Sequence, residues 1–338
     1  MTALEFTLPA ELEAHEPPEA RGLSRDRVRL LVGHRSSDTV RHHRFTDLPG
    51  LLAPGDVLVV NTSATLPAAV GVTGGELTVH FSTEQPDGSW LVEPRRNTAK
   101  ATEPFGDAAA GDSYPLVGGA TVTLREPYSA GRLWIATLDT AVRPYLDAFG
   151  APIRYSYVHR RWPLSYYRTV FGTTPGSAEM PSASRPFTDR MVSRLVSAGI
   201  QFAPVLLHTG VASPEAHERP YPEPFAVSAH SARVVNQARA AGGRIIAIGT
   251  TAVRALETAA GADGLVHPAN GWTDLIVTPG RGVRVTDGLL TGFHEAQASH
   301  VDMLTTIAGP RLLDHTYTEA ISAGYLWHEF GDVNLILP

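Results

Sequence analysis

Short runs of alternating apolar and polar residues dominate the chain between about residues 68 and 146. Gly-rich or Asp-Gly turns separate these runs, at Gly74-Gly75, Asp87-Gly88 and Gly118-Gly119. A period of two that is broken by such turns is typical of antiparallel β structure. The pattern therefore predicts a small β-barrel or sandwich. Its expected strands cover residues 76–81, 89–93, 120–124 and 132–138.

The sequence on either side of this region alternates apolar runs with helical periods, which favours an α/β fold with a mainly parallel sheet. The predicted strands are Val28–Val32, Val57–Val60, Val205–His208, Asp274–Thr278, Val283–Thr286 and Val333–Leu337. The predicted helices are Thr188–Ala198, Ser228–Ala241, Thr316–Ala323 and one that begins at Ser299 with Asp302 as a capping partner. A length of 338 residues suggests about two domains. We expect an α/β domain from residues 1–66 and 149–338 and an inserted all-β, barrel-like domain at 67–148.

The segment Gly243–Thr258 reads as a strand, a Gly-Thr-Thr turn and a helix. The first N–H groups of such a helix have no partner and its dipole is positive there, so this end suits an anion. Thr250 or Thr251 is expected to cap the helix, and Arg254 adds a forked donor for a carboxylate or phosphate. An ordinary surface turn with a threonine cap has the same pattern. The spacing matches neither a nucleoside triphosphate loop nor a dinucleotide fingerprint.

Composition excludes several kinds of chemistry. The chain has no cysteine, which removes disulfides, thiolate nucleophiles and Cys-ligated metals, and Lys100 is its one lysine. The histidine spacing does not indicate a metal site either. The formal net charge of −6 argues against a protein that simply coats nucleic acid, although one local basic face stays compatible with it. The acidic N-terminus does not resemble a secretory signal, so we expect a cytoplasmic protein.

Two histidines lie where predicted strands end. His208 closes the run Val205–Leu207, and ligands of α/β sheets bind at such ends. The segment that begins at Asp287 reaches His294 after a glycine turn, and histidine can act as an acid or base near neutral pH. Asp287, His208 and His294 are therefore the candidate catalytic residues. The chain has 14 histidines, so a structural role is the alternative for each of them.

Two further segments are candidates for ligand contact. The loop before Phe187 is rich in small residues and includes Pro181 and Ser182, so it could wrap around a ligand. A second segment interleaves arginines, which neutralise phosphates, with aromatic rings, which stack on bases. A domain junction with stacked side chains is the alternative. The segment contains Arg154, Tyr155, Tyr157, Arg160, Arg161 and Trp162.

Taken together, these segments resemble the S-adenosylmethionine:tRNA ribosyltransferase-isomerases of queuosine biosynthesis. The resemblance runs nearly end to end, and its most specific block is Gly-Thr-Thr-x-Val-Arg-Ala-Leu-Glu at Gly249–Glu257. It implies an α/β domain with an inserted β-barrel. It also implies that the ribosyl part of S-adenosylmethionine goes to an aminomethyl-7-deazaguanine base of tRNA, with loss of adenine and methionine. The cofactor contacts it implies are Gly249, Thr250, Thr251, Arg254, Glu257, Pro181, Ser182 and Phe293.

Several loops depart from the pattern of the resembled family. Asn61 is followed by Thr-Ser-Ala instead of Asp-Thr-Arg, and the loop before Phe187 lacks the usual histidine. The segments after His208 and His294 also differ. The scaffold is kept while pocket segments are rewritten, so two alternatives stay open. One is a divergent enzyme that uses S-adenosylmethionine on a small molecule or cleaves it without tRNA. The other is a non-catalytic binder of RNA or a nucleoside.

Overall fold

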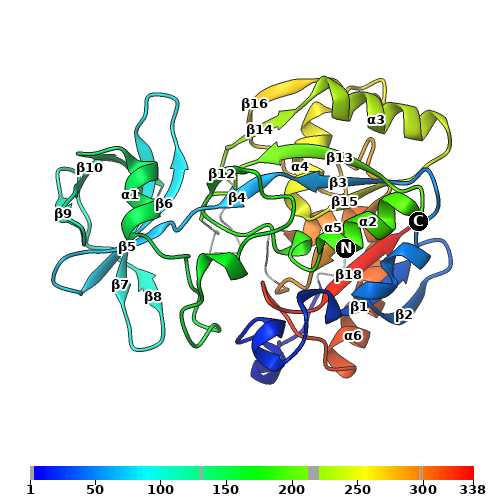
Figure 1. Cartoon of the computed structure of the whole chain (residues 1–338), viewed down its shortest axis with the longest axis horizontal. Helices are drawn as coiled ribbons and strands as arrows, with labels where there is room; N and C mark the ends of the chain where they lie inside the picture. The colour runs from blue at the N-terminus through cyan, green and yellow to red at the C-terminus, as the bar shows by residue number, and fades with distance from the viewer. Residues whose placement is uncertain (1–3, 130–131, 212–220, 297, 299) are drawn as a thin grey trace.

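The computed structural model describes residues 4–129, 132–211, 221–296, 298 and 300–338. Its larger sheet has nine strands (Figure 1). In spatial order they are β16 (Ala269–Thr273), β14 (Glu223–Val227), β13 (Gln201–Leu207), β3 (Val57–Asn61), β15 (Ile245–Ile248), β17 (Gly288–Gly292), β18 (Val333–Leu337), β1 (Arg29–His34) and β2 (Thr39–Arg44).

The larger sheet is mixed, which corrects the expectation of a mainly parallel sheet. Its central strands β13, β3, β15 and β17 are parallel, as is the pair β18 and β1. The other four ladders are antiparallel. The parallel centre is what positions a site, because the carboxyl ends of β3, β15 and β17 all reach the same edge of the sheet.

Helices cover both faces of the larger sheet. On β3, the residues Leu58 and Val60 point to one side and Val57 and Val59 to the other, as expected for a strand buried on both faces. The first side packs against α2 and the turn of 3₁₀ helix at Phe45–Gly50. The second side packs against the other four helices. The helices are α2 (Asp189–Ser197), α3 (Ala229–Ala240), α4 (Thr250–Ala259), α5 (His300–Ala308) and α6 (Pro310–Ser322).

The smaller sheet has seven strands and is antiparallel throughout. Its two outer strands approach each other at an isolated bridge between Val72 and Leu116, so the sheet curls into a half-barrel. Helix α1 (Val142–Phe149) packs on it through Tyr145 and Leu146. The strands are β5 (Ala69–Gly71), β6 (Leu77–Glu84), β7 (Trp90–Asn97), β8 (Thr102–Pro104), β9 (Ser113–Pro115), β10 (Thr121–Ser129) and β11 (Leu133–Leu138).

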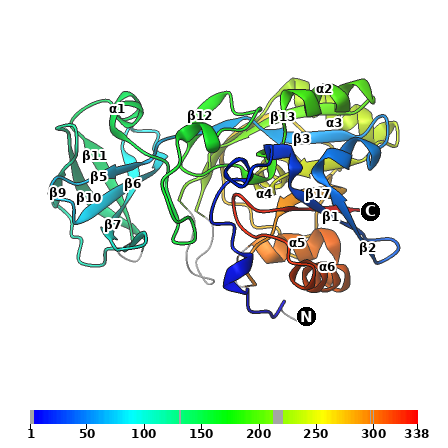
Figure 2. The same ribbon diagram turned by 60° about the horizontal axis from the view of Figure 1, so that its bottom comes forward.

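The smaller sheet lies to one side of the larger one in both views, joined to it through the short parallel pair β4 (Ser63–Thr65) and β12 (Thr174–Ser177) (Figures 1 and 2). All of its strands fall within residues 67–148, the range expected for the inserted unit. That this range forms a separate domain stays a prediction.

Several local expectations hold and others do not. The helices predicted to begin at Thr188 and Ser228 form α2 and α3, and each of these two hydroxyls caps its helix. The runs 274–278 and 283–286 form no strands, and α6 begins at Pro310 instead of Thr316. The expected cap at Ser299 lies outside the described residues. No helix in the described part of the chain is long and apolar enough to cross a membrane.

Candidate functional site

A cavity of about 520 Å³ opens between the two sheets. Its floor is the edge where β15 and β17 end, followed by Gly249–Thr251 and by Gly292–His294. The 3₁₀ turn Ser182–Ser184 and the segment 152–157 form further walls. Parallel strands place ligand sites at this edge, because each strand there gives way to a loop or a helix N-terminus. The cavity is the candidate functional site.

Seven of the predicted site residues line this cavity although they are up to 113 positions apart in sequence. They come from the loop before Phe187, from the start of α4 and from the end of β17. The geometry therefore brings together three segments that the sequence marked separately. The residues are Pro181, Ser182, Gly249, Thr250, Thr251, Phe293 and His294.

Helix α4 begins at the cavity without a side-chain cap. Its N-cap is Gly249, with φ of 90°, a conformation that favours glycine. The expected cap by Thr250 or Thr251 is therefore absent, and Thr251 instead accepts a hydrogen bond from the Asn61 side chain at 3.1 Å. No side chain of the described residues caps this turn, and Gly249, Thr250 and Thr251 line the cavity, so the first N–H groups of α4 suit an anion there.

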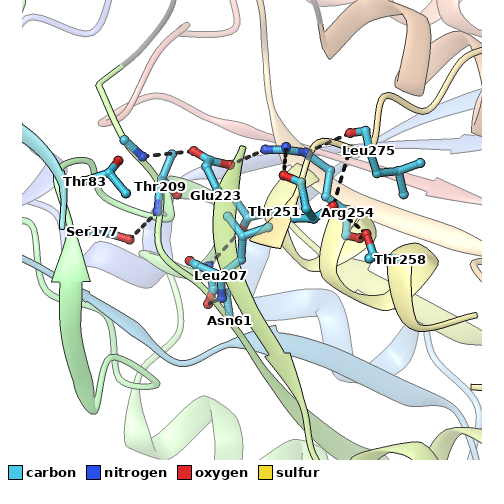
Figure 3. Close-up of polar contacts among 12 residues, drawn as sticks. Asn61, Thr83, Ser177, Leu207, Thr209, Glu223, Thr251, Arg254, Thr258 and Leu275 are labelled. Atoms are coloured by element: carbon cyan, nitrogen blue, oxygen red, sulfur yellow. Dashed lines mark hydrogen bonds and ion pairs between the residues drawn. The ribbon is translucent and has the colours of Figure 1, made fainter. Parts of the chain in front are cut away.

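Arg254 does not line the cavity, which corrects its expected role as a direct anion contact. Its side chain is 7% exposed and forms a buried ion pair with Glu223 (Figure 3). Its Nε donates to the carbonyl of Leu275 at 3.0 Å, and Nη2 donates to that of Thr273 at 3.2 Å. All three guanidinium nitrogens of Arg254 thus donate hydrogen bonds to other groups of the protein. The Oε1 atom of Glu223 accepts from the N–H of Gly210 at 2.9 Å, so the pair joins α4 to β14 and to the segment after β13.

Glu257 and Asp287 are also structural in this fold. The Glu257 carboxylate is 1% exposed and accepts the backbone N–H groups of Arg284, Val285 and Thr286. Asp287 precedes β17 at the amino edge of the sheet, where it accepts the N–H of Ile245 at 2.8 Å. Neither lines the cavity. The structure therefore does not support direct cofactor contact for Glu257 or catalysis by Asp287.

His208 lies behind the cavity wall and does not line it. Its Nδ1 is 2.7 Å from the Oγ of Ser63, which is in turn 2.6 Å from the Oγ of Ser177. A Cβ added at Gly176 would meet the His208 ring at 2.4 Å, so this glycine is required for the close approach. Burial lowers the pKa of His208 to about 4, and Arg143 adds to this. His208 therefore stays neutral and ties β4, β12 and the end of β13 together.

His294, the second candidate catalytic histidine, lines the cavity. Its Nε2 is 3.0 Å from the Oγ1 of Thr291, its ring stacks on His300 at 4.6 Å, and its N–H donates to the hydroxyl of Tyr317. Burial holds the pKa of His294 well below its usual value, and the neighbouring His300 and His328 act in the same direction. His294 is thus a neutral ring at the carboxyl end of β17.

The smaller sheet contributes charged residues to the cavity that sequence reasoning missed. His80 on β6 lies directly opposite Glu93 on β7, and both are buried. The Glu93 carboxylate pairs with Arg95 at 2.6 Å and with Arg132 at 3.3 Å. Burial lowers the pKa of His80 to about 3. The signal in the sequence was a histidine and a glutamate flanked by apolar residues, in Val79-His80-Phe81 and Val92-Glu93-Pro94, where a charged side chain needs a buried partner or a ligand.

The loop before β18 brings His328 and Glu329 to the cavity, and neither residue could be selected from its sequence context. The hydroxyl of Tyr157 donates to Glu329 at 2.9 Å, and the His328 ring stacks on Tyr157 at 3.9 Å. Burial raises the pKa of Glu329 to about 7, although the Tyr157 hydrogen bond and Arg185 oppose this.

The basic-aromatic segment is divided between two environments. Arg154, Tyr155 and Tyr157 line the cavity. Arg160 is exposed and its guanidinium lies 3.9 Å above the ring of Trp162, while Arg161 is exposed next to it. The segment thus runs from the cavity to the surface. In the described part of the chain, no cluster of three or more His, Cys, Asp or Glu side chains is placed to hold a metal ion.

Comparisons with known proteins agree on one family. A family model described as queuosine biosynthesis protein matches residues 1–336. A protein of Symbiobacterium thermophilum named S-adenosylmethionine:tRNA ribosyltransferase-isomerase is 34% identical over 352 residues, covering 100% of this chain and 99% of the relative. A protein of Moorella thermoacetica with the same name is 35% identical and covers 98% of both chains.

A solved structure is similar as well. The crystal structure of an S-adenosylmethionine tRNA ribosyltransferase from Thermotoga maritima matches with a TM-score of 0.56 and 25% identity, over 99% of this chain and 100% of that one. Family model, relatives and fold thus agree along the whole length. The chain belongs to the family of queuosine biosynthesis proteins.

Proposed function

We propose that this protein transfers the ribosyl group of S-adenosylmethionine to the aminomethyl group of a 7-deazaguanine base in tRNA, and isomerises it with release of adenine and methionine. The observation that carries the proposal is the cavity, where seven predicted site residues meet in a chain whose relatives are named for this reaction. S-adenosylmethionine is then a substrate. Because its sulfonium acidifies the adjacent C5′ hydrogen, a positioned base suffices to start the reaction without a metal ion. A tRNA substrate implies action in the cytoplasm.

The cavity is large enough for such a substrate. Its volume of about 520 Å³ lies within the range of about 300–1,000 Å³ that is usual for small-molecule sites. The start of α4 supplies backbone donors for the methionine carboxylate. We assign Arg254 an indirect role, in which its pair with Glu223 fixes α4 against β14. Phe293 and Tyr157 add aromatic rings to the cavity lining, which suits a sulfonium cation.

The opposite wall supports a separate place for the acceptor base. His80, Glu93 and Arg95 face the cavity from the smaller sheet, whereas the α4 terminus faces it from the larger one. Walls that face each other allow two substrates to be held next to each other for reaction. The basic-aromatic segment begins at the cavity and ends at the surface, so it is the proposed path for the tRNA backbone.

The test of this function is product analysis by mass spectrometry. The protein is incubated with S-adenosylmethionine and with tRNA that either carries or lacks the aminomethyl-deazaguanine base. We expect adenine and methionine only with the modified tRNA. Cofactor breakdown without tRNA would instead indicate the divergent reaction on S-adenosylmethionine. Binding of S-adenosylmethionine without any product in either arm would contradict the proposed function and favour a non-catalytic binder.

Replacing Arg160 and Arg161 together by alanine is expected to raise the KM for tRNA about tenfold, since each lost phosphate contact weakens binding. The KM for S-adenosylmethionine should stay unchanged. The salt dependence of tRNA binding should also become shallower by about one unit of slope per lost contact. Arg233→Ala with Arg311→Ala, at exposed positions on α3 and α6, is the matched control. An unchanged salt slope in the Arg160/Arg161 variant would remove this segment from the tRNA interface.

A further inference from the structure

Glu329 has one carboxylate oxygen fixed and one without a partner. Oε2 accepts the hydroxyl hydrogen of Tyr157 at 2.9 Å. Oε1 is buried and has no hydrogen-bond partner among the described residues. The residue lines the cavity between the two sheets. A buried carboxylate oxygen without a partner is costly, and such groups persist where a ligand or a reaction uses them.

The backbone around Glu329 is held in place. His328 adopts φ of 71°, which is uncommon for a residue with a side chain, and its ring stacks on Tyr157 with an interplanar angle of 10°. Asp332 accepts the N–H groups of Arg29 at 2.7 Å and Leu326 at 2.9 Å, which closes the loop onto β1. The Glu329 carboxylate is therefore positioned by its surroundings before any substrate binds.

Glu329 is also a stronger base than the histidine that faces the same cavity. Burial raises the pKa of Glu329 to about 7, whereas burial lowers the pKa of His294 well below its usual value. The Nε2 of His294 is in addition engaged with Thr291 at 3.0 Å. A base is most effective when its pKa lies near the working pH, which favours Glu329. The ionisable groups that face Glu329 or the Tyr157 hydroxyl are Tyr157, Tyr167, Arg185, Glu295 and His328.

We infer that the carboxylate of Glu329 is the base that removes the C5′ hydrogen of S-adenosylmethionine, with Tyr157 as its positioning residue. This inference rests on the proposed function. In the step, the C5′–H bond breaks and an O–H bond forms on Oε1. The electron pair stays on C5′, where the adjacent sulfonium stabilises it. Tyr157 keeps its hydrogen bond to Oε2 throughout and so holds the carboxylate in one orientation.

The first experiment follows adenine release and the exchange of C5′ hydrogens of S-adenosylmethionine in D₂O by mass spectrometry. Glu329→Gln keeps the shape and can still accept from Tyr157, so we expect it to fold and to bind S-adenosylmethionine within threefold of wild type. Its kcat should fall by about 10²–10⁴-fold, the usual contribution of a positioned base. C5′ exchange should be lost in parallel. Glu319→Gln is the matched control and should behave as wild type. Glu319 lies on α6, and its half-exposed carboxylate pairs with His42 on β2.

Two further readouts separate a base from a merely structural residue. Formate should restore turnover to Glu329→Gly in proportion to its concentration, because it supplies the missing carboxylate. The acidic limb of the kcat/KM profile, near pH 7 in wild type, should move to higher pH in Tyr157→Phe. The intact Tyr157 hydrogen bond lowers the pKa of Glu329, so its loss raises that pKa. Loss of S-adenosylmethionine binding in Glu329→Gln, without rescue by formate, would overturn the assignment.

The outcomes distinguish this inference from the proposed function. If the wild-type protein turns over and Glu329→Gln retains at least one third of that activity, the role of Glu329 is overturned and the proposed function is left intact. A second outcome is that the wild-type protein exchanges C5′ hydrogens without forming tRNA-dependent products, and that Glu329→Gln loses this exchange. It would support the assignment of Glu329 as the base and contradict the tRNA reaction. A wild-type protein that neither exchanges C5′ hydrogens nor forms products would overturn both.

Discussion

Replacing Glu223 by alanine is expected to destabilise the protein by about 3–5 kcal/mol, the usual cost of leaving one partner of a buried ion pair without the other. Arg254 and Glu223 are each 7% exposed, so neither charge can regain water without local unfolding. Burial alone raises the pKa of Glu223, and it is the Arg254 charge and the Gly210 N–H that oppose this. The measurement is urea unfolding at pH 7.5, followed by circular dichroism.

The design of this experiment includes two controls. Asp107→Ala removes one partner of an exposed pair with Arg96 and should cost less than about 1 kcal/mol. The double variant Glu223→Leu with Arg254→Met should lose less than the sum of its single changes, because it removes both charges together. A loss below about 1 kcal/mol in Glu223→Ala would show that the pair is not buried as the structure has it.

The same change is expected to lower activity without touching the substrate. Arg254 holds the carbonyls of Thr273 and Leu275, and Glu223 holds the N–H of Gly210 next to Val211, which lines the cavity. The sequence suggested Arg254 as an anion contact because its spacing from Gly249 is right for one. Spacing along one helix could not reveal that Glu223, 31 positions earlier in the sequence, forms an ion pair with the Arg254 guanidinium.

The strands of the smaller sheet could be predicted because their signals are local. Alternation of apolar residues and Gly-Gly or Asp-Gly turns lie within a few positions of each strand, and β6, β7, β10 and β11 form where expected. The runs at 274–278 and 283–286 have similar apolar content but form no strand. The Glu257 carboxylate accepts hydrogen bonds from the backbone N–H groups of residues 284–286. These bonds take the place of the strand-to-strand hydrogen bonds that the apolar pattern predicted for the run 283–286.

The candidate site was predicted on one wall only. Residues at the ends of β15 and β17 could be selected because parallel strands place ligands there. His80, Glu93 and Glu329 could not, since their importance arises from the way the smaller sheet and the loop before β18 approach the larger sheet. Such long-range placement has no counterpart in local spacing.

Acid is expected to unfold the protein at pH values well above the pKa of ordinary carboxylates, because His80, His208, His294, His300 and His328 are shielded from water in the folded chain and their pKa values are lowered. Burial is the main cause for each of them. The pKa is about 3 for His80, about 4 for His208, His300 and His328, and well below its usual value for His294. The usual pKa of histidine is 6.5. Between pH 6.5 and about 4, these histidines therefore bind protons in the unfolded chain and stay neutral in the folded chain, which lowers stability as the pH falls.

Three buried carboxyls act in the opposite direction. Burial raises the pKa of Glu329 to about 7 and also raises that of Glu223 and Asp332, so the folded chain holds protons there that the unfolded chain releases. Their protonation stabilises the folded state as the pH falls. The histidines outnumber these carboxyls, so the unfolded chain takes up more protons than the folded chain and stability falls as the pH falls below 6.5.

Each histidine that takes up a proton only on unfolding removes about 1.4 kcal/mol per pH unit below 6.5, so several of them together remove a large part of a typical stability of about 5–15 kcal/mol within a few pH units. Urea unfolding at pH 7.5, 6.5, 5.5 and 4.5 measures this slope directly. His80→Gln should lower it by about 1.4 kcal/mol per pH unit, since one histidine no longer takes up a proton on unfolding. Stability that stays flat between pH 6.5 and 5 would mean that these histidines are not buried as neutral rings. The cavity wall formed by His80, His294, His300 and His328 therefore couples the integrity of the site to pH.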